Sequence, residues 1–560
     1  MRTRLICRAA GGLDAPARTE AIVWHLPAVA ARRDAEVNFV EFRIAAEYIP
    51  YIGEINVIFD IGRSSIKIAN PAIAFAAIGA SLALLLLTPQ IFVRLQHYQA
   101  KINLRLSAGG CSEAAPNTLL DRFTAINPDP NFSYPVETYG RRFVDQSGRV
   151  FLLKMMASWA MAQRCSNTTI TNALEGLKSL GFNSVLVAPF GVHLNNSFGD
   201  RYQNESGQRF FTGAPYASAF GPAWSSMDWV VEEATRLEMT VVLSIFLSFD
   251  DTGTAPDLIS AGPANSYDYG KALALRYAKY RNIIWHVEGD TMWPSNGSLG
   301  RQLDAVFHGI RDGEGSKPRL IIAEQQRGFT GYGQFMQDGG YQWFKPNANS
   351  LYSYEANAVE LFDAVYEEKG ASSLGVIDIE PPYVNSPHYT GDKNQQYRER
   401  NYSIFLRGGI GINYGHEKWW PFGAAGIYDG GTGWFEILNE APQLQAKYAW
   451  SLIDKYVADP LWSRDSGKFL RLGTGDGDTK AASGYSNVAA VAYFPTDRSV
   501  MVDTTVIAGP VNVKLSWYDP TTGKYTVISN SEAAIENRSI ASPGARADGS
   551  ADWVLVVERS

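Results

Sequence analysis

Cysteine is nearly absent from this chain of 560 residues, which contains only Cys7, Cys111 and Cys165. Three cysteines cannot build a disulfide scaffold or a zinc site with four cysteine ligands. In an oxidising compartment Cys111 and Cys165 form one disulfide, or both stay free. A strong excess of charge is also lacking, because 50 Lys and Arg face 57 Asp and Glu, a net charge of -7. That balance gives no electrostatic reason to expect a nucleic-acid partner.

Several motifs of other enzyme classes are missing as well. The chain has no Gly-x-Ser-x-Gly elbow of an α/β-hydrolase. His193 and His416 fall where loops should follow strands, but no HExxH or two-His-one-carboxylate spacing occurs. We therefore expect no metal site, and no feature indicates a cofactor.

Aromatic residues, in contrast, are plentiful. They make up 12% of the chain, with 14 Trp and 28 Tyr. Sugar rings present apolar C–H faces that stack on such side chains, and core packing accounts for many aromatic residues equally well. The aromatic content therefore favours a carbohydrate ligand without specifying one.

One long apolar run is present at residues 71–93, which carry no charge and follow Arg63 and Lys67. It is long enough to cross a bilayer, and the basic residues before it place the part beyond about residue 100 outside the cell. We expect a membrane anchor or a signal segment, with a buried core helix as the alternative. Residues 1–70 would be a cytoplasmic or non-native segment and residues 94–136 a linker. The folded part would then be extracellular or at the cell surface, secreted or anchored.

From about residue 137 apolar strands alternate with amphipathic helices. Eight strand and helix pairs predict a (β/α)8 TIM barrel over residues 137–460. A doubly wound sheet is the alternative, but no Gly-rich phosphate loop follows the first strand. The predicted strands are 151–155, 184–188, 240–245, 283–287, 319–323, 342–354, 374–379 and 410–414.

The pattern changes again near residue 461. Short strands separated by turns predict a small antiparallel β-sandwich over residues 461–560. Its predicted strands are 488–494, 499–506, 512–517, 524–528 and 553–557.

Carboxylates end two of the predicted barrel strands. Side chains alternate across a strand, so residues two apart share a face. In the fourth strand His286, Glu288 and Asp290 share one face, and in the seventh Asp378 and Glu380 do. The C-terminal ends of barrel strands surround the active site, so we expect these acids at one mouth.

Two carboxyl groups at one cleft are what glycoside hydrolysis requires. One protonates the leaving oxygen, and the other attacks the anomeric carbon or activates water. Crowded like charges raise one pKa and so keep a proton available near neutral pH. The alternative is a buried ion-pair network with Arg398 or Arg400.

An ordered series of motifs resembles the apiosidase-like glycoside hydrolases. A tail with Trp517-Tyr518-Asp519-Pro520 is similar to the small β-domain that is often joined to them and labelled collagen-binding. Together the resemblance spans residues from about 137 to 560. The barrel motifs are Gly140-Arg141-Arg142-Phe143, Ser158-Trp159, Gly221-Pro222-Ala223-Trp224, Arg276-Tyr277 through Glu288-Gly289-Asp290, Glu380-Pro381-Pro382-Tyr383, and Gly408 to His416 with Trp419 or Trp420.

The resemblance implies a retaining hydrolase with Glu380 as nucleophile and Asp290 as acid/base. The chain departs from the family pattern in two places. Met156-Ala157-Ser158-Trp159 stands where members carry Asp-Thr-x-Trp, which removes a substrate-binding carboxylate, and Glu288 replaces the first Gly of Gly-Gly-Asp. Glu288 would therefore either orient Asp290 or replace it.

The combined hypothesis is a glycoside hydrolase that cleaves an oligo- or polysaccharide of a plant or microbial cell surface. The alternative is a catalytically inactive surface protein that binds carbohydrate in the same cleft. No feature indicates an oligomeric state. The residues expected to line the sugar site are Trp159, His193, His286, Tyr383, Tyr414, His416 and Trp419.

Overall fold

The chain divides into two compact units, Met1–Asn117 and Thr118–Ser560. The computed structural model describes four strands between residues 20 and 68, and the chain from residue 132 to its end except 193–199, 248–252, 288–289, 291–296, 325–326, 328–340, 356, 369–370, 372, 387–392, 424–432 and 508–510. The four strands of the first unit form one antiparallel sheet in chain order: β1 (Glu20–His25), β2 (Glu41–Tyr48), β3 (Ile55–Ile61) and β4 (Ser64–Ile68).

Residues 71–93, predicted to be an anchor or signal segment, lie outside the described residues. Within the part that is described, no helix combines the length and apolar character needed to cross a membrane. Cys165 is buried. Cys111 lies outside the described residues, so the disulfide between the two stays a prediction.

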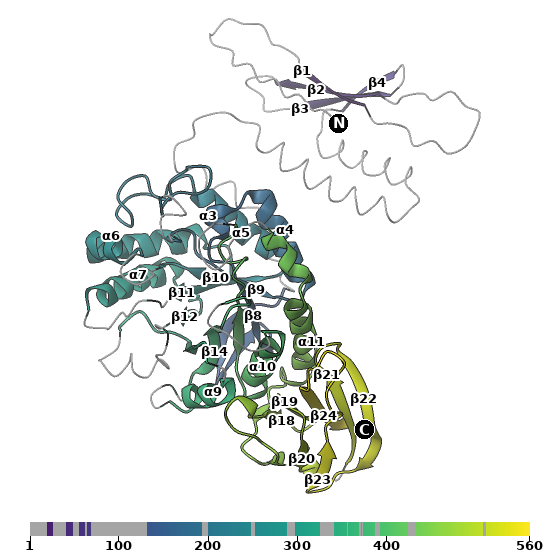
Figure 1. Ribbon diagram of the computed structural model, residues 1–560. Helices are drawn as coiled ribbons and strands as arrows, with labels where there is room; N and C mark the ends of the chain where they lie inside the picture. Colours follow the sequence, from purple (N-terminus) through teal and green to yellow (C-terminus); the bar gives the residue numbers. More distant parts are fainter. Residues whose placement is uncertain are drawn as a thin grey trace, which may run out of the picture. The chain divides into compact units, whose positions relative to one another are not determined.

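The second unit begins its main fold with eight parallel strands in a nearly closed barrel (Figure 1). Neighbouring strands pair in chain order, and the last strand pairs with the first. The fifth and sixth strands are joined through Asn347, whose N–H donates to Ile321 O and whose Oδ1 accepts from Ile321 N, both at 2.8 Å. The predicted (β/α)8 barrel is therefore confirmed. Its strands are β8 (Leu153–Ala157), β9 (Ser184–Val187), β10 (Thr240–Ser244), β11 (Ile283–Val287), β12 (Ile321–Ala323), β13 (Ala348–Tyr352), β14 (Gly375–Glu380) and β15 (Gly411–Tyr414).

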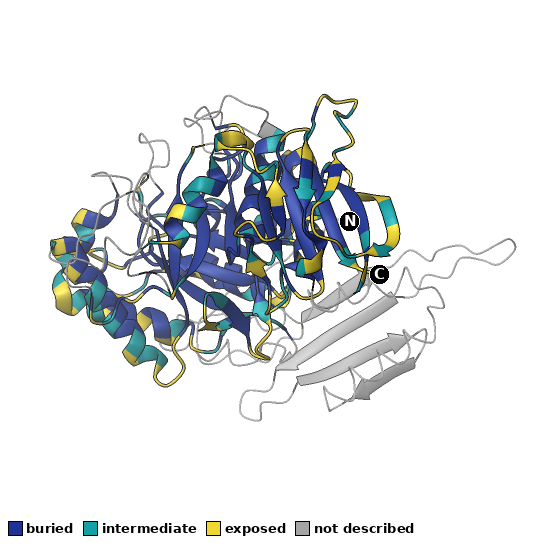
Figure 2. Cartoon of the chain, turned by 90° about the horizontal axis from the view of Figure 1, so that it is seen from below, coloured by how far each residue is buried: buried dark blue, intermediate teal, exposed yellow. Residues whose placement is uncertain are grey.

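Helices cover the outside of the barrel, and Figure 2 shows the buried strands inside their partly exposed layer. In α4, Ser166 caps the N-terminus by accepting from Thr169 N, and the buried stripe of Ile170, Ala173, Leu174 and Leu177 faces the core. The helices are α3 (Met161–Arg164), α4 (Asn167–Ser179), α5 (Trp224–Arg236), α6 (Ala255–Arg276), α7 (Ser298–Glu314), α9 (Ala358–Tyr366), α10 (Lys393–Leu406) and α11 (Ala441–Tyr456), with the 3-10 helix η4 (Trp434–Asn439) before the last.

A three-stranded antiparallel sheet precedes the barrel and consists of β5 (Pro135–Tyr139), β6 (Arg142–Asp145) and β7 (Val150–Phe151). The carbonyl oxygen of Arg141 would lie 2.7 Å from a Cβ placed on Gly375, the first residue of β14. The turn between β5 and β6 therefore packs against the N-terminal end of the barrel, opposite the end at which the carboxylates lie.

The chain ends in an antiparallel β-domain, as predicted. Its core includes Phe494, Trp517 and Trp553. A six-stranded sheet runs in the order β16-β18-β19-β24-β21-β22 and a three-stranded sheet in the order β17-β20-β23. The strands are β16 (Ser463–Arg464), β17 (Leu470–Leu472), β18 (Ala482–Tyr485), β19 (Ala489–Phe494), β20 (Ser499–Val502), β21 (Asn512–Asp519), β22 (Lys524–Ala533), β23 (Arg538–Ala541) and β24 (Trp553–Arg559).

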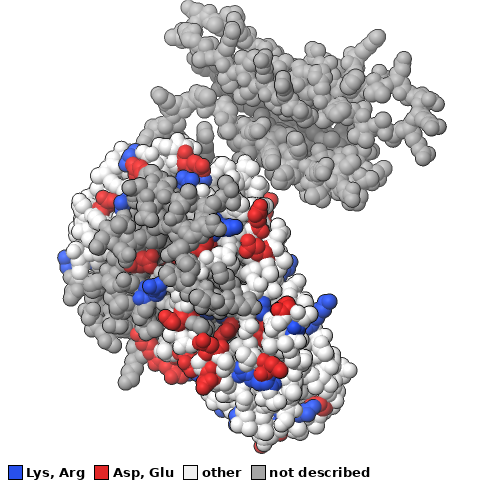
Figure 3. Space-filling view, in the orientation of Figure 1, with Lys and Arg blue, Asp and Glu red and all other residues white. Residues whose placement is uncertain are grey.

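The helix α10 joins the barrel to this β-domain. Arg398 forms a buried two-pronged pair with Asp552, at 2.7 and 2.8 Å, so this arginine serves the domain junction and not a barrel carboxylate. Tyr402 of α10 stacks on Tyr493 of β19, with ring centroids 4.8 Å apart. Acidic side chains gather on the lower part of the face shown in Figure 3. Asp363 of α9 pairs with Arg464 of β16, at 3.1 Å.

Candidate active site

The two predicted catalytic acids follow the fourth and seventh barrel strands. Asp290 lies just beyond β11 and is partly exposed, while Glu380 ends β14 and is 8% exposed. Because the strands are parallel, both acids lie at the same end of the barrel, where enzymes of this fold place their active sites. Glu288, also predicted to be catalytic, falls outside the described residues, as does His193.

Two tyrosines at the end of β13 connect these acids. Tyr352 Oη donates to Asp290 Oδ1 at 2.8 Å, and Tyr354 Oη donates to Glu380 Oε1 at 3.4 Å. The two hydroxyl oxygens lie 3.2 Å apart. A shift in the strand register between Leu351 and Tyr352 marks an irregularity in β13 at this point, and such irregularities re-aim side chains. The acids therefore belong to one cluster, in which each accepts a hydrogen bond from one of two adjacent tyrosine hydroxyls.

The second oxygen of Glu380 is held from the opposite side. Tyr383 Oη donates to Glu380 Oε2 at 2.9 Å, and Trp159 Nε1 donates to Tyr383 Oη at 2.8 Å. Both aromatic residues were predicted to line the sugar site, and the structure brings them to the carboxylate cluster. They fix the orientation of the Glu380 carboxyl group.

The electrostatics of the cluster favour retention of a proton. Burial raises the pKa of Glu380 well above its usual range, and the charges of Asp290 and Glu417 raise it further. The hydrogen bonds from Tyr383 and Tyr354 act in the opposite direction, because they stabilise the ionised carboxylate. Burial also raises the pKa of both tyrosines, which therefore remain hydrogen-bond donors at neutral pH.

His286 lies next to this cluster in the interior. Its ring is fully buried, 5.8 Å from the Trp159 ring, and its Nδ1 is 3.3 Å from Ser244 Oγ. Its Nε2 is 3.5 Å from Glu324 Oε2. Burial lowers the pKa of His286 to about 3, so the ring is neutral at neutral pH. Its contacts with Ser244 and Glu324 are therefore polar contacts of an uncharged ring and not ion pairs.

Asp378 shares the predicted face of Glu380 but has a different environment. It is fully buried, and its Oδ2 lies 3.0 Å from Arg400 Nε. Arg400 also donates to the carbonyl oxygens of Ser353, at 2.5 Å, and Glu355, at 3.2 Å. Asp378 therefore belongs to a buried ion pair with Arg400, which was the alternative considered from the sequence. The expectation that Asp378 lies at the barrel mouth together with Glu380 is wrong. Arg400 ties β14 to the segment that carries Tyr354.

Tyr414, predicted to line the sugar site, lies in the core instead. It is fully buried, and its ring centroid is 4.7 Å from Tyr397 and 5.9 Å from Phe182. These neighbours belong to α10 and to the segment before β9, so Tyr414 packs between the barrel wall and its helices. A strand-end tyrosine that faces the helices cannot contact a sugar in the barrel mouth.

His416 and Trp419 are likewise buried and act as supports. His416 Nδ1 accepts from Lys418 N at 3.0 Å, so its Nε2–H faces Glu440 Oε2 at 3.1 Å. Trp419 Nε1 donates to Ser158 Oγ at 2.8 Å. Both residues are fully buried. They hold the loop after β15 against the first barrel segment rather than line the cleft.

Four residues of the cluster were not predicted: Glu324, Tyr352, Tyr354 and Glu417. Glu324 follows the apolar strand β12 in the same way that Glu380 ends β14, which is a signal that could have identified it. The tyrosines lie at the end of the sixth predicted strand. In the described part of the chain, no group of three or more His, Cys, Asp or Glu is arranged to hold a metal ion.

The buried pair of Arg400 and Asp378 should be strongly coupled. We expect Arg400→Met to lower the free energy of unfolding by about 3–5 kcal/mol, because it leaves a buried carboxylate without its counterion. Asp378→Asn in the same chain should recover part of that loss. Urea denaturation of both single variants and the double variant measures the coupling.

The exposed pair of Arg209 and Asp200, with 2.8 Å between Nη1 and Oδ2, provides the control and should show a coupling of less than about 1 kcal/mol. Equal couplings at the two pairs would contradict the structural role given to Arg400.

Comparison with known proteins identifies both folded parts. The family described as "Apiosidase-like, catalytic domain" matches residues 137–458. The family described as "Putative collagen-binding domain of a collagenase" matches residues 473–558. Comparison with curated proteins finds no match.

Two solved structures share the fold. One, described as "Glycoside hydrolase", has 20% sequence identity and a TM-score of 0.64, over 78% of this chain and 98% of its own. A glycoside hydrolase family 5 protein from Bacteroides vulgatus ATCC 8482 has the same identity and TM-score, over 78% of this chain and 95% of its own. Because the catalytic-domain family covers more than half of the 560 residues, the protein belongs to the apiosidase-like family of glycoside hydrolases.

Proposed function

We propose that the protein is a retaining glycoside hydrolase that cleaves an oligo- or polysaccharide of a plant or microbial cell surface. The observation that carries this proposal is the cluster in which Tyr352 and Tyr354 connect Asp290 with Glu380. Retaining enzymes use two carboxyl groups close enough to flank one glycosidic bond. Both acids come from strand ends of the barrel that the family uses for glycoside hydrolysis.

In the first step Glu380 attacks the anomeric carbon, and the bond to the leaving oxygen breaks. Asp290 gives its proton to that oxygen, so the leaving sugar departs as an alcohol. In the second step Asp290 takes a proton from water, and the resulting hydroxide displaces Glu380 from the anomeric carbon. The carboxyl groups return to their starting protonation states.

The hydrogen bonds of the cluster match these roles. The raised pKa of Glu380 keeps a proton in the site. Glu380 attacks as the ionised carboxylate, so that proton must pass to Asp290 when substrate binds. Tyr383 and Tyr354, which both donate to Glu380, would stabilise the negative charge that this transfer leaves on it. Glu288, two residues before Asp290, either orients Asp290 or takes its place as proton donor.

The substrate assignment rests on the side chains around Glu380 and on the chain before the barrel. Tyr383 donates a hydrogen bond to Glu380, and Trp159 donates one to Tyr383. A sugar held beside Glu380 would therefore lie against aromatic rings. The apolar residues 71–93 would place the barrel outside the cell, anchored or secreted. A glycan of a cell surface is the substrate accessible at that location.

A catalytically inactive carbohydrate-binding protein is the second candidate. The observation in its favour is Met156, which stands where family members carry a substrate-binding carboxylate and is fully buried. The loss of that carboxylate removes a contact to sugar but leaves the Asp290 and Glu380 cluster intact. Variants of these two acids distinguish the candidates.

We expect Glu380→Gln and Asp290→Asn each to lower turnover at least about a thousandfold while the proteins stay folded. The reason is that each amide keeps the shape of the side chain but can neither attack carbon nor transfer the proton. Product release from a panel of cell-wall glycans measures turnover, and circular dichroism checks the fold.

Glu536→Gln and Asp268→Asn are the matched controls, because both residues are exposed and lie in the β-domain and on α6. They should keep full activity. Near-normal activity of Glu380→Gln on a substrate that the original protein cleaves would overturn the assignment of the nucleophile.

The pH dependence tests the role of the tyrosines. The hydrogen bond from Tyr383 lowers the pKa of Glu380, so Tyr383→Phe should raise that pKa. Glu380 must be ionised to attack, and the acidic limb of kcat/KM should therefore move to higher pH in the variant. The pH profile of kcat/KM on one glycan measures this. An unchanged or lowered acidic limb would contradict the proposed charge on Glu380.

A further inference from the structure

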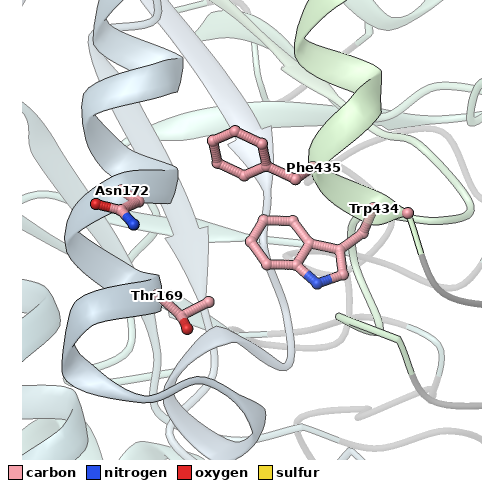
Figure 4. Close-up of a pocket in the computed structure, with 5 residues that line it drawn as sticks. Thr169, Asn172, Trp434 and Phe435 are labelled. Atoms are coloured by element: carbon pink, nitrogen blue, oxygen red, sulfur yellow. The ribbon is translucent and has the colours of Figure 1, made fainter.

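A groove with a cavity volume of about 300 Å³ lies between α4 and η4. It is lined by Thr169, Asn172, Gly433, Trp434 and Phe435. Figure 4 shows Thr169 and Asn172 on α4 and, on the other side of the gap, the aromatic side chains of Trp434 and Phe435. Ligand pockets in proteins begin at about this volume, which suits a single small ring better than a peptide.

The aromatic wall of the groove is held in place by other rings. Trp434 packs edge-on against Trp419, at 5.3 Å between centroids, and against Phe422, at 5.0 Å. Phe435 lies 5.5 Å from Trp434 and is 46% exposed. Large aromatic side chains are usually buried. A half-exposed phenylalanine beside a fixed indole ring therefore provides a surface on which the apolar face of a ligand can stack.

The two walls cannot separate easily. A Cβ placed on Gly176 of α4 would lie 2.4 Å from Leu438 Cδ1 of η4, so the helix and the 3-10 helix are in close contact where glycine leaves room. Leu438 is buried at 8% exposure. The groove is therefore formed before any ligand arrives, which reduces the entropy lost on binding.

The groove also offers polar groups. Asn172 contributes an exposed side-chain amide, and Trp434 contributes its indole N–H. Thr169 adds a hydroxyl group, whose oxygen lies 2.9 Å from Ser166 Oγ. Stacking surfaces edged by amide and hydroxyl groups are complementary to a sugar, which has apolar C–H faces and a rim of hydroxyls.

A short chain of contacts relates the groove to the carboxylates. Trp434 packs on Trp419, whose indole donates to Ser158, the residue before Trp159. Trp159 in turn donates to Tyr383, the partner of Glu380. In the chain, α4 follows the first barrel strand, β8, and η4 follows the eighth, β15. The groove and the acids thus belong to the same end of the barrel.

We propose that this groove is an accessory subsite that binds one sugar unit of the glycan that the barrel cleaves, apart from the catalytic carboxylates. The inference rests on the proposed function for the identity of the glycan. The sugar face stacks on Phe435 and Trp434, and its hydroxyls pair with Asn172 and the indole N–H. Such a subsite holds a long chain on the enzyme without contacting the bond that breaks.

Binding and cleavage are measured separately to test it. The full-length chain carrying Glu380→Gln, which removes cleavage, is compared with the same chain carrying Phe435→Ala or Asn172→Ala as well. The probes are immobilised plant cell-wall pectins and xylans and bacterial exopolysaccharides. Tyr139→Ala is the control, since Tyr139 is 78% exposed and lies on β5 at the other end of the barrel.

We expect Phe435→Ala to weaken polysaccharide binding about three- to tenfold, the size of one stacking contact, and Asn172→Ala to weaken it less. With Glu380 restored, Phe435→Ala should raise KM for the polysaccharide and leave kcat/KM for an aryl monoglycoside unchanged. Tyr139→Ala should match the parent chain in both measurements.

Polysaccharide binding by Phe435→Ala equal to that of the parent chain overturns the subsite, as does binding of none of the probes by the parent. An equal loss of kcat/KM on polysaccharide and monoglycoside also overturns it. Cleavage that disappears only with Glu380→Gln supports the hydrolase whatever the groove variants do. A chain that binds through the groove but cleaves nothing retains the subsite and refutes the hydrolase.

Discussion

Two carboxyl groups of like charge share one small, largely buried space in this protein, and the rest of the site is built around that constraint. Ionised together, Asp290 and Glu380 would repel each other where little water screens them. The hydroxyls of Tyr352, Tyr354 and Tyr383 offset this by donating hydrogen bonds to both acids. Burial, and after it the charge of Asp290, raises the pKa of Glu380, which keeps in the site a proton that can be passed to a leaving oxygen.

The helix α10 connects the strand that carries Glu380 to the C-terminal β-domain. Arg400 binds Asp378, two residues before Glu380, and also the carbonyl oxygens on either side of Tyr354. Arg398, two residues earlier on the helix, binds Asp552 of the β-domain. The strand β14 and the C-terminal domain are thus fixed to one helix, which gives the β-domain a structural role.

Much of the fold could be predicted from local sequence. The strand at 283–287 agrees with β11 at both ends, and those at 184–188 and 240–245 agree with β9 and β10 to within one residue, because buried parallel strands are short apolar runs between turns. Strand parity grouped Asp290 and Glu380 with the barrel mouth. The sequence of the four N-terminal strands shows no periodic pattern of apolar residues, and no element was predicted for them.

Residues whose role depends on distant partners could not be predicted in this way. Asp378 and Glu380 share a face in the sequence, but Arg400 on α10 forms an ion pair with only the first. The irregularity in β13 re-aims Tyr352 toward Asp290, which parity alone does not indicate. Tyr414 ends a strand like Glu380 does, yet Phe182 and Tyr397 enclose it. These outcomes are set by packing between segments far apart in the chain.

The most direct measurement is to trap the glycosyl-enzyme intermediate. A 2-deoxy-2-fluoro glycoside with a good leaving group slows the second step of a retaining hydrolase and leaves the sugar attached to the nucleophile. Peptide mass spectrometry then identifies the labelled residue. The account predicts a single label on Glu380. A label on Glu324, Glu417 or Asp290, or turnover without any covalent label, would contradict it.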